Sequence, residues 1–296
     1  MSAATVGSGR SGSSKRPVAG LPTTSPTRSM PATSRSAWAR PGWSRSDEPR
    51  PRRRGWRGGK PAVVVFDGEG ILLDVEGTTS SIAFVHETLF GFARDHMPEF
   101  LAGHGEEPRV AELVACIVAE ADRLAVESDG PGDAAAAAAE LMDSDAKFGP
   151  LKELQGMVWR QGFESGELVA HLFDDVPPAL ARWRDAGLDV RIFSSGSVEA
   201  QRLFFAHTAA GDLSGLLRGH YDTTTGAKRD PESYRRVAAD YGCEPRKILF
   251  VSDVVDELDA ARAAGMATAL AVRPGNPPAE AATTHEPIHS FDDIVS

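Results

Sequence analysis

Ile71-Leu72-Leu73-Asp74-Val75-Glu76-Gly77-Thr78-Thr79 is the stretch of sequence that decides the fold. Its apolar beginning is typical of a buried parallel strand, and it leads directly into two carboxylates separated by one residue. Because successive side chains of an extended chain alternate in direction, Asp74 and Glu76 point to one side and Val75 points to the other. Paired carboxylates suit Mg²⁺, and an aspartate can attack phosphorus. An acidic turn that closes a strand is the ordinary alternative.

The same spacing of acids occurs seven residues earlier, at Asp67-Gly68-Glu69-Gly70. We prefer the second copy because a full hydrophobic strand precedes it and the hydroxyls of Thr78 and Thr79 follow it. The first copy is interpreted as an irregular lead-in. Since this short pattern is weak by itself, the interpretation of Asp74 depends on the motifs that follow.

Short β-rich runs alternate with helical stretches over most of the chain after Pro61. Such alternation predicts a parallel sheet covered by helices on both faces, an α/β fold. The expected strands are 62–66, 71–73, 189–193, 248–251 and 267–272, and the expected helices are 198–207, 231–241 and 257–264.

The segment from Ser81 to Asp175 contains no convincing strand and three stretches that favour a helix, at 110–126, 134–139 and 150–162. We therefore predict a helical cap inserted at 81–175, above the carboxyl edge of the sheet, where ligands of such folds bind. The core then consists of 61–80 and 176–296.

Polar side chains follow two further strands and one loop. Ser194 and Ser195 end the expected strand 189–193, where hydroxyls and free N–H groups can cradle a phosphate, although a serine N-cap is the ordinary alternative. Lys228 precedes a helix and can hold phosphate as a point charge, whereas a lone loop lysine is usually solvated. Asp253 follows the strand 248–251 as a third acidic contact for Mg²⁺, with Glu257 close behind to orient the ligands.

An acid pair, serine, lysine and acid in this order resemble the four motifs of the haloacid dehalogenase superfamily of phosphotransferases. Most superfamily phosphatases have Asp where this chain has Glu76, and Glu at that position resembles the enolase-phosphatase E1 family, also called acireductone synthase. The resemblance runs from about Ile71 to the C-terminus. It implies a Rossmann-like haloacid dehalogenase core with an inserted helical cap. Other stretches similar to that family are 154–160, 194–201, 221–223 and 272–276.

This resemblance implies a bifunctional, Mg²⁺-dependent enzyme of methionine salvage. Such an enzyme enolises 2,3-diketo-5-methylthiopentyl 1-phosphate and then removes the phosphate to give the acireductone. By motif, Asp74 and Glu76 are the catalytic residues and bind Mg²⁺ with Asp253, while Ser194, Ser195 and Lys228 bind substrate and Glu257 lies beside them. The base for enolisation stays open, with Glu76 as a candidate, and an aspartyl-phosphate at Asp74 is the superfamily's expectation.

Three alternatives compete with this interpretation. A phosphatase of the same fold would act on another small phosphate ester without enolisation, and a substrate panel would distinguish it. Dehalogenase chemistry is disfavoured because it needs neither a lysine near phosphate nor three acids around a metal. A catalytically idle scaffold whose basic tail binds nucleic acid would bind in a strongly salt-dependent way.

The composition is that of a soluble chain. Its 296 residues are 41% hydrophobic, enough for a substantial core, and no apolar run approaches the roughly 20 residues of a membrane span. Cys116 and Cys243 cannot form a disulfide framework, so we expect a reducing compartment, the cytoplasm. Because one chain supplies all the motifs, we expect a monomer with a small-molecule substrate and with neither a membrane nor a nucleic-acid partner.

Charge separates the first 60 residues from the rest. They carry 13 Lys and Arg against Asp47 and Glu48, whereas the remainder holds 19 basic and 40 acidic side chains. We predict a disordered, basic, low-complexity tail at 1–60. A start codon placed too far upstream, an organelle transit peptide and a nucleic-acid patch at Arg50–Arg54 are its interpretations, in that order.

A few conspicuous residues are not assigned a function. His86, just past the acid pair, is expected to be solvated or packed, because a lone histidine has no ligand partner at metal spacing. His207 and His220 receive the same interpretation. Trp159 is expected to pack within the cap rather than close over the substrate.

Overall fold

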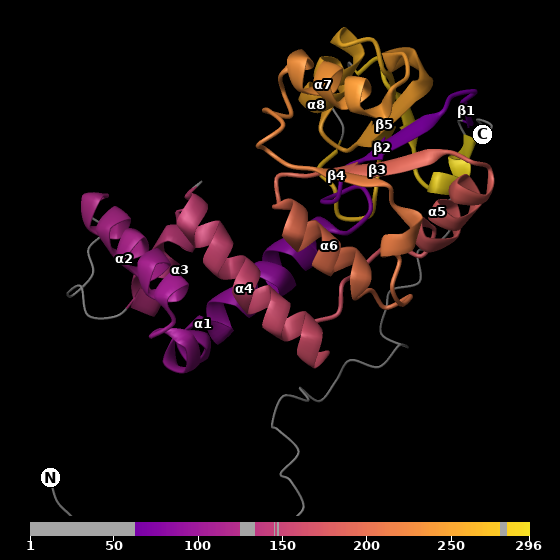
Figure 1. Cartoon of the computed structure of the whole chain (residues 1–296). Helices are drawn as coiled ribbons and strands as arrows, with labels where there is room; N and C mark the ends of the chain where they lie inside the picture. Colours follow the sequence, from indigo (N-terminus) through magenta and orange to yellow (C-terminus); the bar gives the residue numbers. More distant parts are fainter. Residues whose placement is uncertain (1–62, 125–133, 145, 147, 279–282) are drawn as a thin grey trace, which may run out of the picture. The chain divides into compact units, whose positions relative to one another are not determined.

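The computed structural model describes residues 63–124, 134–144, 146, 148–278 and 283–296 (Figure 1). The tail predicted at 1–60 lies outside the described residues. Within the described part of the chain, no helix combines the length and apolarity needed to cross a membrane.

A six-stranded parallel sheet forms the centre of the fold, with strand order β4-β3-β2-β5-β6-β7. In register, Leu73 of β2 lies opposite Ile192 of β3 and Val251 of β5, so these three strands end at the same level. The sheet confirms the predicted α/β class. Its strands are β2 (Gly70–Leu73), β3 (Asp189–Phe193), β4 (Gly219–Tyr221), β5 (Ile248–Ser252), β6 (Ala267–Ala271) and β7 (Glu286–Ile288).

Helices cover both faces of this sheet. Figure 1 shows α5 (Val176–Asp185) and α6 (Val198–Ala206) on one side of the strands, and α7 (Pro231–Tyr241) and α8 (Val255–Ala263) on the other. The alternation of side chains along β2 explains both layers. Ile71 and Leu73 pack in the core that contains α5 and α6, whereas Leu72 packs in the core that contains α7 and α8. All three are fully buried, as expected for a central parallel strand.

The run 62–66 does not form a buried strand of this sheet, so that prediction is wrong. Only Val64–Val65 is extended, as β1, and it pairs with β8 (Ile294–Val295) in a separate two-stranded sheet. Val65 is 78% exposed. The reason is packing: β2 is buried on both faces between β3 and β5, which leaves β1 only the C-terminal strand as a partner.

Between β2 and α5 the described residues form helices and no strand. These are a π-helical stretch (Phe84–Leu89), α1 (Phe90–His104), α2 (Pro108–Arg123), α3 (Ala134–Asp143) and α4 (Gly149–Ser165). Helices α1 to α4 share a core of their own, which includes Met97, Ile117 and Leu141. The domain boundaries at 81 and 175 stay a prediction.

Helix α4 also contacts the core next to α6. Phe163 and Trp159 belong to the same hydrophobic cluster as α5 and α6. Trp159 is buried, and its indole N–H donates to the backbone oxygen of Leu89 over 2.7 Å. It therefore packs as a buried residue, but in the cluster shared with α5 and α6 rather than in the core of α1 to α4. The remaining short elements are the 3₁₀ helices Ser214–Leu216, Pro245–Lys247 and Phe291–Asp293.

Candidate active site

The order of strands in the sheet reverses at β2. The chain moves outward through β3 and β4, and then crosses to the opposite side of β2 to form β5. In open parallel sheets, ligands bind beyond the carboxyl ends of the strands at such a reversal. Asp74 follows β2 and Asp253 follows β5, so the topology brings the two predicted acids to this place.

The carboxylate of Asp74 is buried and held from three sides. Its Oδ1 accepts a hydrogen bond from the backbone N–H of Val75 over 2.7 Å and lies 2.8 Å from Nζ of Lys228. Its Oδ2 accepts from the hydroxyl of Ser252 over 3.2 Å. With both oxygens bound to donors, the side chain has a defined orientation and is more than the end of an acidic turn.

Lys228 lies between two carboxylates. Its Nζ is 2.6 Å from Oε2 of Glu257 and 2.8 Å from Oδ1 of Asp74, and its side chain is only 10% exposed. Burial lowers the pKa of Lys228, but the charges of Asp74 and Glu257 outweigh burial and raise the pKa above its ordinary value. The ordinary interpretation of a solvated loop lysine is therefore wrong.

More negative than positive charge gathers here. Burial, followed by the charge of Asp74, raises the pKa of Asp253 to about 7. The same two causes raise the pKa of Glu257, against the effect of Lys228. Among the described residues, the carboxylates of Asp74, Asp253 and Glu257 thus gather around the ammonium of Lys228, and carboxylate oxygen is the donor that Mg²⁺ prefers. The donor chemistry of these residues therefore suits a divalent cation.

Glu76 is directed elsewhere. Its Oε1 is 2.8 Å from Nε2 of His86, and its side chain is 39% exposed. Among the described residues, no group of three His, Cys, Asp or Glu side chains converges closely enough to form a metal centre by itself. The geometry therefore brings Asp253 to Asp74 and leaves Glu76 at the more open side, next to His86.

Ser194 and Ser195 follow β3 at the same edge of the sheet. The hydroxyl of Ser194 accepts a hydrogen bond from the N–H of Gly196 over 3.2 Å, and Ser195 is exposed. The backbone oxygen of Ser195 is 3.5 Å from Nζ of Lys152 on α4. Ser197 is the N-cap of α6, the ordinary role for a serine at a helix start. In the described part of the chain, no hydrogen bond joins the Ser194 or Ser195 hydroxyl to the acids.

Sequence reasoning missed two participants. Ser252 lies within hydrogen-bond distance of both Asp74 and Glu257, and its signal is a hydroxyl at the end of an otherwise apolar strand. His86 is exposed, in agreement with the expectation of a solvated histidine, but its ring also contacts Glu76. Its position just past the acid pair was the available signal in the sequence.

The parallel sheet and the acids at its carboxyl edge define a class of protein. Residues 62–265 match the haloacid dehalogenase-like hydrolase family, so the chain is a hydrolase of this superfamily. The UTR4 protein of Saccharomyces cerevisiae has a similar crystal structure, with a TM-score of 0.66 and 33% sequence identity, covering 76% of this chain and 99% of that protein.

Two curated relatives narrow the class further. Enolase-phosphatase E1 of Sorangium cellulosum is 46% identical over 233 residues, 79% of this chain and all of that protein. Enolase-phosphatase E1 of Frankia alni is 48% identical over 226 residues, 76% of this chain and 94% of that protein. The chain belongs to the enolase-phosphatase E1 family, as its motifs predicted, and it is a phosphatase.

Proposed function

We propose that this phosphatase is the enolase-phosphatase of methionine salvage. In this proposal it enolises 2,3-diketo-5-methylthiopentyl 1-phosphate and then hydrolyses the phosphate ester to give the acireductone, with Mg²⁺ as cofactor. The observation that carries the proposal is the buried Asp74 carboxylate, oriented by Lys228 and Ser252, with a second acid two residues further on. The names of the relatives support the choice of substrate.

Asp74 acts as the nucleophile in this proposal. One carboxylate oxygen attacks phosphorus, the bond from phosphorus to the substrate oxygen breaks, and Glu76 donates the proton that the leaving oxygen takes up. A water deprotonated by Glu76 then attacks the aspartyl-phosphate, which releases inorganic phosphate and restores Asp74. The geometry supports this division of roles, because Asp74 is buried and fixed whereas Glu76 is partly exposed.

Enolisation comes first and moves a proton from carbon to a base. Glu76 is the candidate, since its carboxylate lies at the open side of the site and pairs with the ring of His86, which can share the proton. Lys228 places a positive charge where the phosphate and the developing oxyanion need it. Ser194 and Ser195 would bind the phosphate from the end of β3.

Asp74 and Asp253 would hold Mg²⁺, whereas the side chain of Glu76, the third predicted ligand, is directed at His86. When bound, Mg²⁺ supplies an electrophile for the enolate oxygen and neutralises charge on the phosphate. Because one chain supplies all the proposed site residues, we also propose that the enzyme works as a monomer.

The test is a paired time course on the diketo-phosphate with Mg²⁺, in which enol absorbance and free phosphate are followed in the same sample. We expect enol to appear before or together with phosphate. Phosphate release from a generic ester, with neither signal from the diketo-phosphate, would instead support a phosphatase of the same fold that acts on another small phosphate ester.

A further inference from the structure

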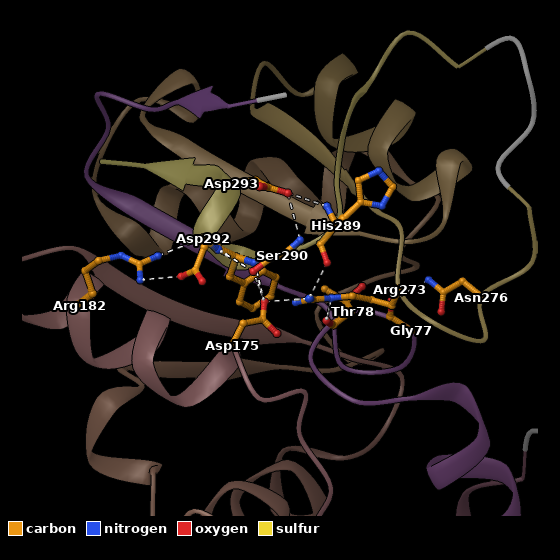
Figure 2. Close-up of polar contacts among 11 residues, drawn as sticks. Gly77, Thr78, Asp175, Arg182, Arg273, Asn276, His289, Ser290, Asp292 and Asp293 are labelled. Atoms are coloured by element: carbon orange, nitrogen blue, oxygen red, sulfur yellow. Dashed lines mark hydrogen bonds and ion pairs between the residues drawn. The ribbon is translucent and has the colours of Figure 1, made fainter. Parts of the chain in front are cut away.

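A buried arginine lies directly beneath the acid loop, which we define as residues 74–80. Arg273, two residues after β6, is 5% exposed, and Figure 2 shows its guanidinium directed at three chain segments. Its Nε donates to the backbone oxygen of Thr78 over 2.9 Å. Its Nη1 is 2.8 Å from Oδ2 of Asp175 and donates to the backbone oxygen of His289 over 3.2 Å.

Asn276 holds the neighbouring carbonyl of the same loop. Its Nδ2 donates to the backbone oxygen of Gly77 over 2.9 Å. Two consecutive peptide oxygens of the acid loop are therefore bound by two side chains from one short segment after β6. These oxygens belong to the two residues that immediately follow Glu76. Their position therefore determines the position of the Glu76 backbone, from which the carboxylate side chain extends.

The contact matters because Gly77 has no space to move toward β5. Its φ is +67°, and a Cβ at this position would overlap the carboxylate of Asp253. The loop backbone thus packs directly against a proposed Mg²⁺ ligand. A small displacement of Gly77 would change the distance between the two sides of the site.

Arg273 also contacts Asp175, at the C-terminal end of the helical insertion. Asp175 precedes α5, and besides Arg273 it accepts hydrogen bonds from the N–H of Phe291 over 2.6 Å and the hydroxyl of Ser290 over 3.2 Å. The two connections to the insertion are themselves joined, since the N–H of Phe173 donates to the backbone oxygen of Thr79 over 3.1 Å. Arg273 therefore contacts the first connection at Thr78 and the second at Asp175.

The guanidinium of Arg273 also contacts two aromatic rings. The guanidinium carbon of Arg273 lies 4.8 Å from the centre of the Phe173 ring and 4.5 Å from that of Phe291. An aliphatic side chain could fill the same space. Replacing a buried ion pair by well-packed apolar side chains is often neutral or stabilising, so stability alone does not explain an arginine here. The rigid fork of arginine, however, can donate to Thr78 and Asp175 at once, which the single ammonium of lysine cannot do in the same plane.

We propose that Arg273 is a positioning residue of the phosphatase site and that Asn276 assists it. Together they hold the Gly77–Thr78 backbone so that Glu76 and Asp253 keep the spacing needed for reaction. The proposal rests on the proposed function, because it assumes that these acids carry the chemistry. Its consequence is that loss of either contact impairs turnover more than folding or substrate binding.

The experiment compares Asn276→Ala and Arg273→Lys with Ser290→Ala as the matched control. Ser290→Ala removes a hydrogen bond to the Asp175 carboxylate, which Arg273 also contacts, and removes no contact to the acid loop. The measurements are thermal unfolding, kcat and KM for phosphate release from the diketo-phosphate and from p-nitrophenyl phosphate, and hydrogen exchange of the Thr78, Thr79 and Ser80 amides. All three amides bond to the backbone oxygen of Val75.

For Asn276→Ala and Arg273→Lys we expect kcat to fall about 10- to 100-fold with KM changed less than about threefold. Exchange of the three loop amides should quicken at least about tenfold. Ser290→Ala should keep kcat and loop exchange within about twofold of wild type. If Arg273→Lys does not fold, Asn276→Ala alone provides the test, because Asn276 is only half-buried.

Wild-type kcat and loop exchange in Asn276→Ala would overturn the proposal, and so would losses no larger than those of Ser290→Ala. A failure of the proposed function is recognised separately. In that case the diketo-phosphate gives no signal with the wild-type enzyme, while loop exchange and turnover of p-nitrophenyl phosphate still decide the role of Arg273.

Discussion

Asp74 and Asp67 occupy the same place in two copies of one short pattern, yet their surroundings differ. Asp67 is exposed before the amino end of β2, whereas Asp74 is 5% exposed at its carboxyl end. Only Asp74 has an ammonium within 3 Å among the described residues of these two copies. The difference makes Asp67 a natural control for Asp74.

Replacing Asp74→Asn is expected to lower the rate of phosphate release by about 10³-fold or more, because an amide is a poor nucleophile. Asp67→Asn should keep the wild-type rate. Initial rates of phosphate release under saturating substrate measure both. Near-normal turnover by Asp74→Asn would exclude an aspartyl-phosphate at this residue.

Lys228 offers a second prediction at this scale, because it is the cation between two buried carboxylates. Lys228→Met should lower the free energy of unfolding by about 3–5 kcal/mol, since it leaves Asp74 and Glu257 unpaired. Adding Glu257→Gln should restore part of the stability and none of the activity. Urea unfolding measures the first effect and phosphate release the second.

The half-buried Lys247 supplies the control, with a 3.3 Å contact to the backbone oxygen of Asp67. Lys247→Met should change the free energy of unfolding by less than about 0.5 kcal/mol. Equal losses for the two lysines would contradict the charge argument.

At the scale of elements, the acid loop depends on a glycine for two reasons. Gly77 has a φ of +67°, and its α-carbon faces the carboxylate of Asp253 without room for a side chain. Gly166, the C-cap of α4, has a φ of +76° but open space where a Cβ would lie. Comparing alanine substitutions at Gly77 and Gly166 therefore separates the cost of backbone strain from the cost of steric overlap.

Gly166→Ala should cost about 1 kcal/mol of unfolding free energy, the cost of a left-handed conformation for a residue with a Cβ. Gly77→Ala should cost more than about 2 kcal/mol, because overlap with Asp253 adds to the strain. We also expect it to lower phosphate release by about 100-fold or more, since the acid must move. Equal costs at the two sites would show that Gly77 tolerates the added carbon.

At the scale of the whole molecule, stability should depend on a histidine remote from the acids. Burial, followed by the charge of Arg202, lowers the pKa of His220 from 6.5 to about 4. Its Nδ1 is 3.2 Å from Oε1 of Gln201, whose amide donates to the backbone oxygens of Gly196 and Tyr221. The folded protein therefore keeps this ring neutral at pH values where the unfolded chain takes up a proton.

It follows that the free energy of unfolding decreases as the pH falls from about 6.5 to about 4, because the unfolded state binds the extra proton. After allowance for the ring's partial exposure, the contribution of His220 is about 1–2 kcal/mol. Urea unfolding of wild type and His220→Gln at pH 7, 6 and 5 measures it. The gap between the two proteins should narrow toward low pH, and a constant gap would contradict the prediction.

Strand order is also a property of the whole molecule, and local sequence predicted only part of it. The expected strands at 71–73, 189–193 and 248–251 are β2, β3 and β5, because strands buried on both faces carry unbroken apolar runs. The edge strand β7 (Glu286–Ile288) was not predicted, since three residues that include a proline have little intrinsic preference and become extended through pairing with β6. Helix α1 was missed for a similar reason: it contains Gly91 and Pro98 and is stabilised by packing.

The sequence by itself determined the α/β class, the family and the residue types that we propose carry the chemistry. These are local signals: an apolar strand followed by acids, serines at a strand end, and a lysine before a helix. Which of those side chains contact one another was decided only by the tertiary structure. Ser252 and Asp74 are 178 residues apart and meet because β2 and β5 are neighbours. Arg273 binds Thr78 across 195 residues, and no local pattern specifies such a contact, because its energy depends on a folded sheet that places both segments together.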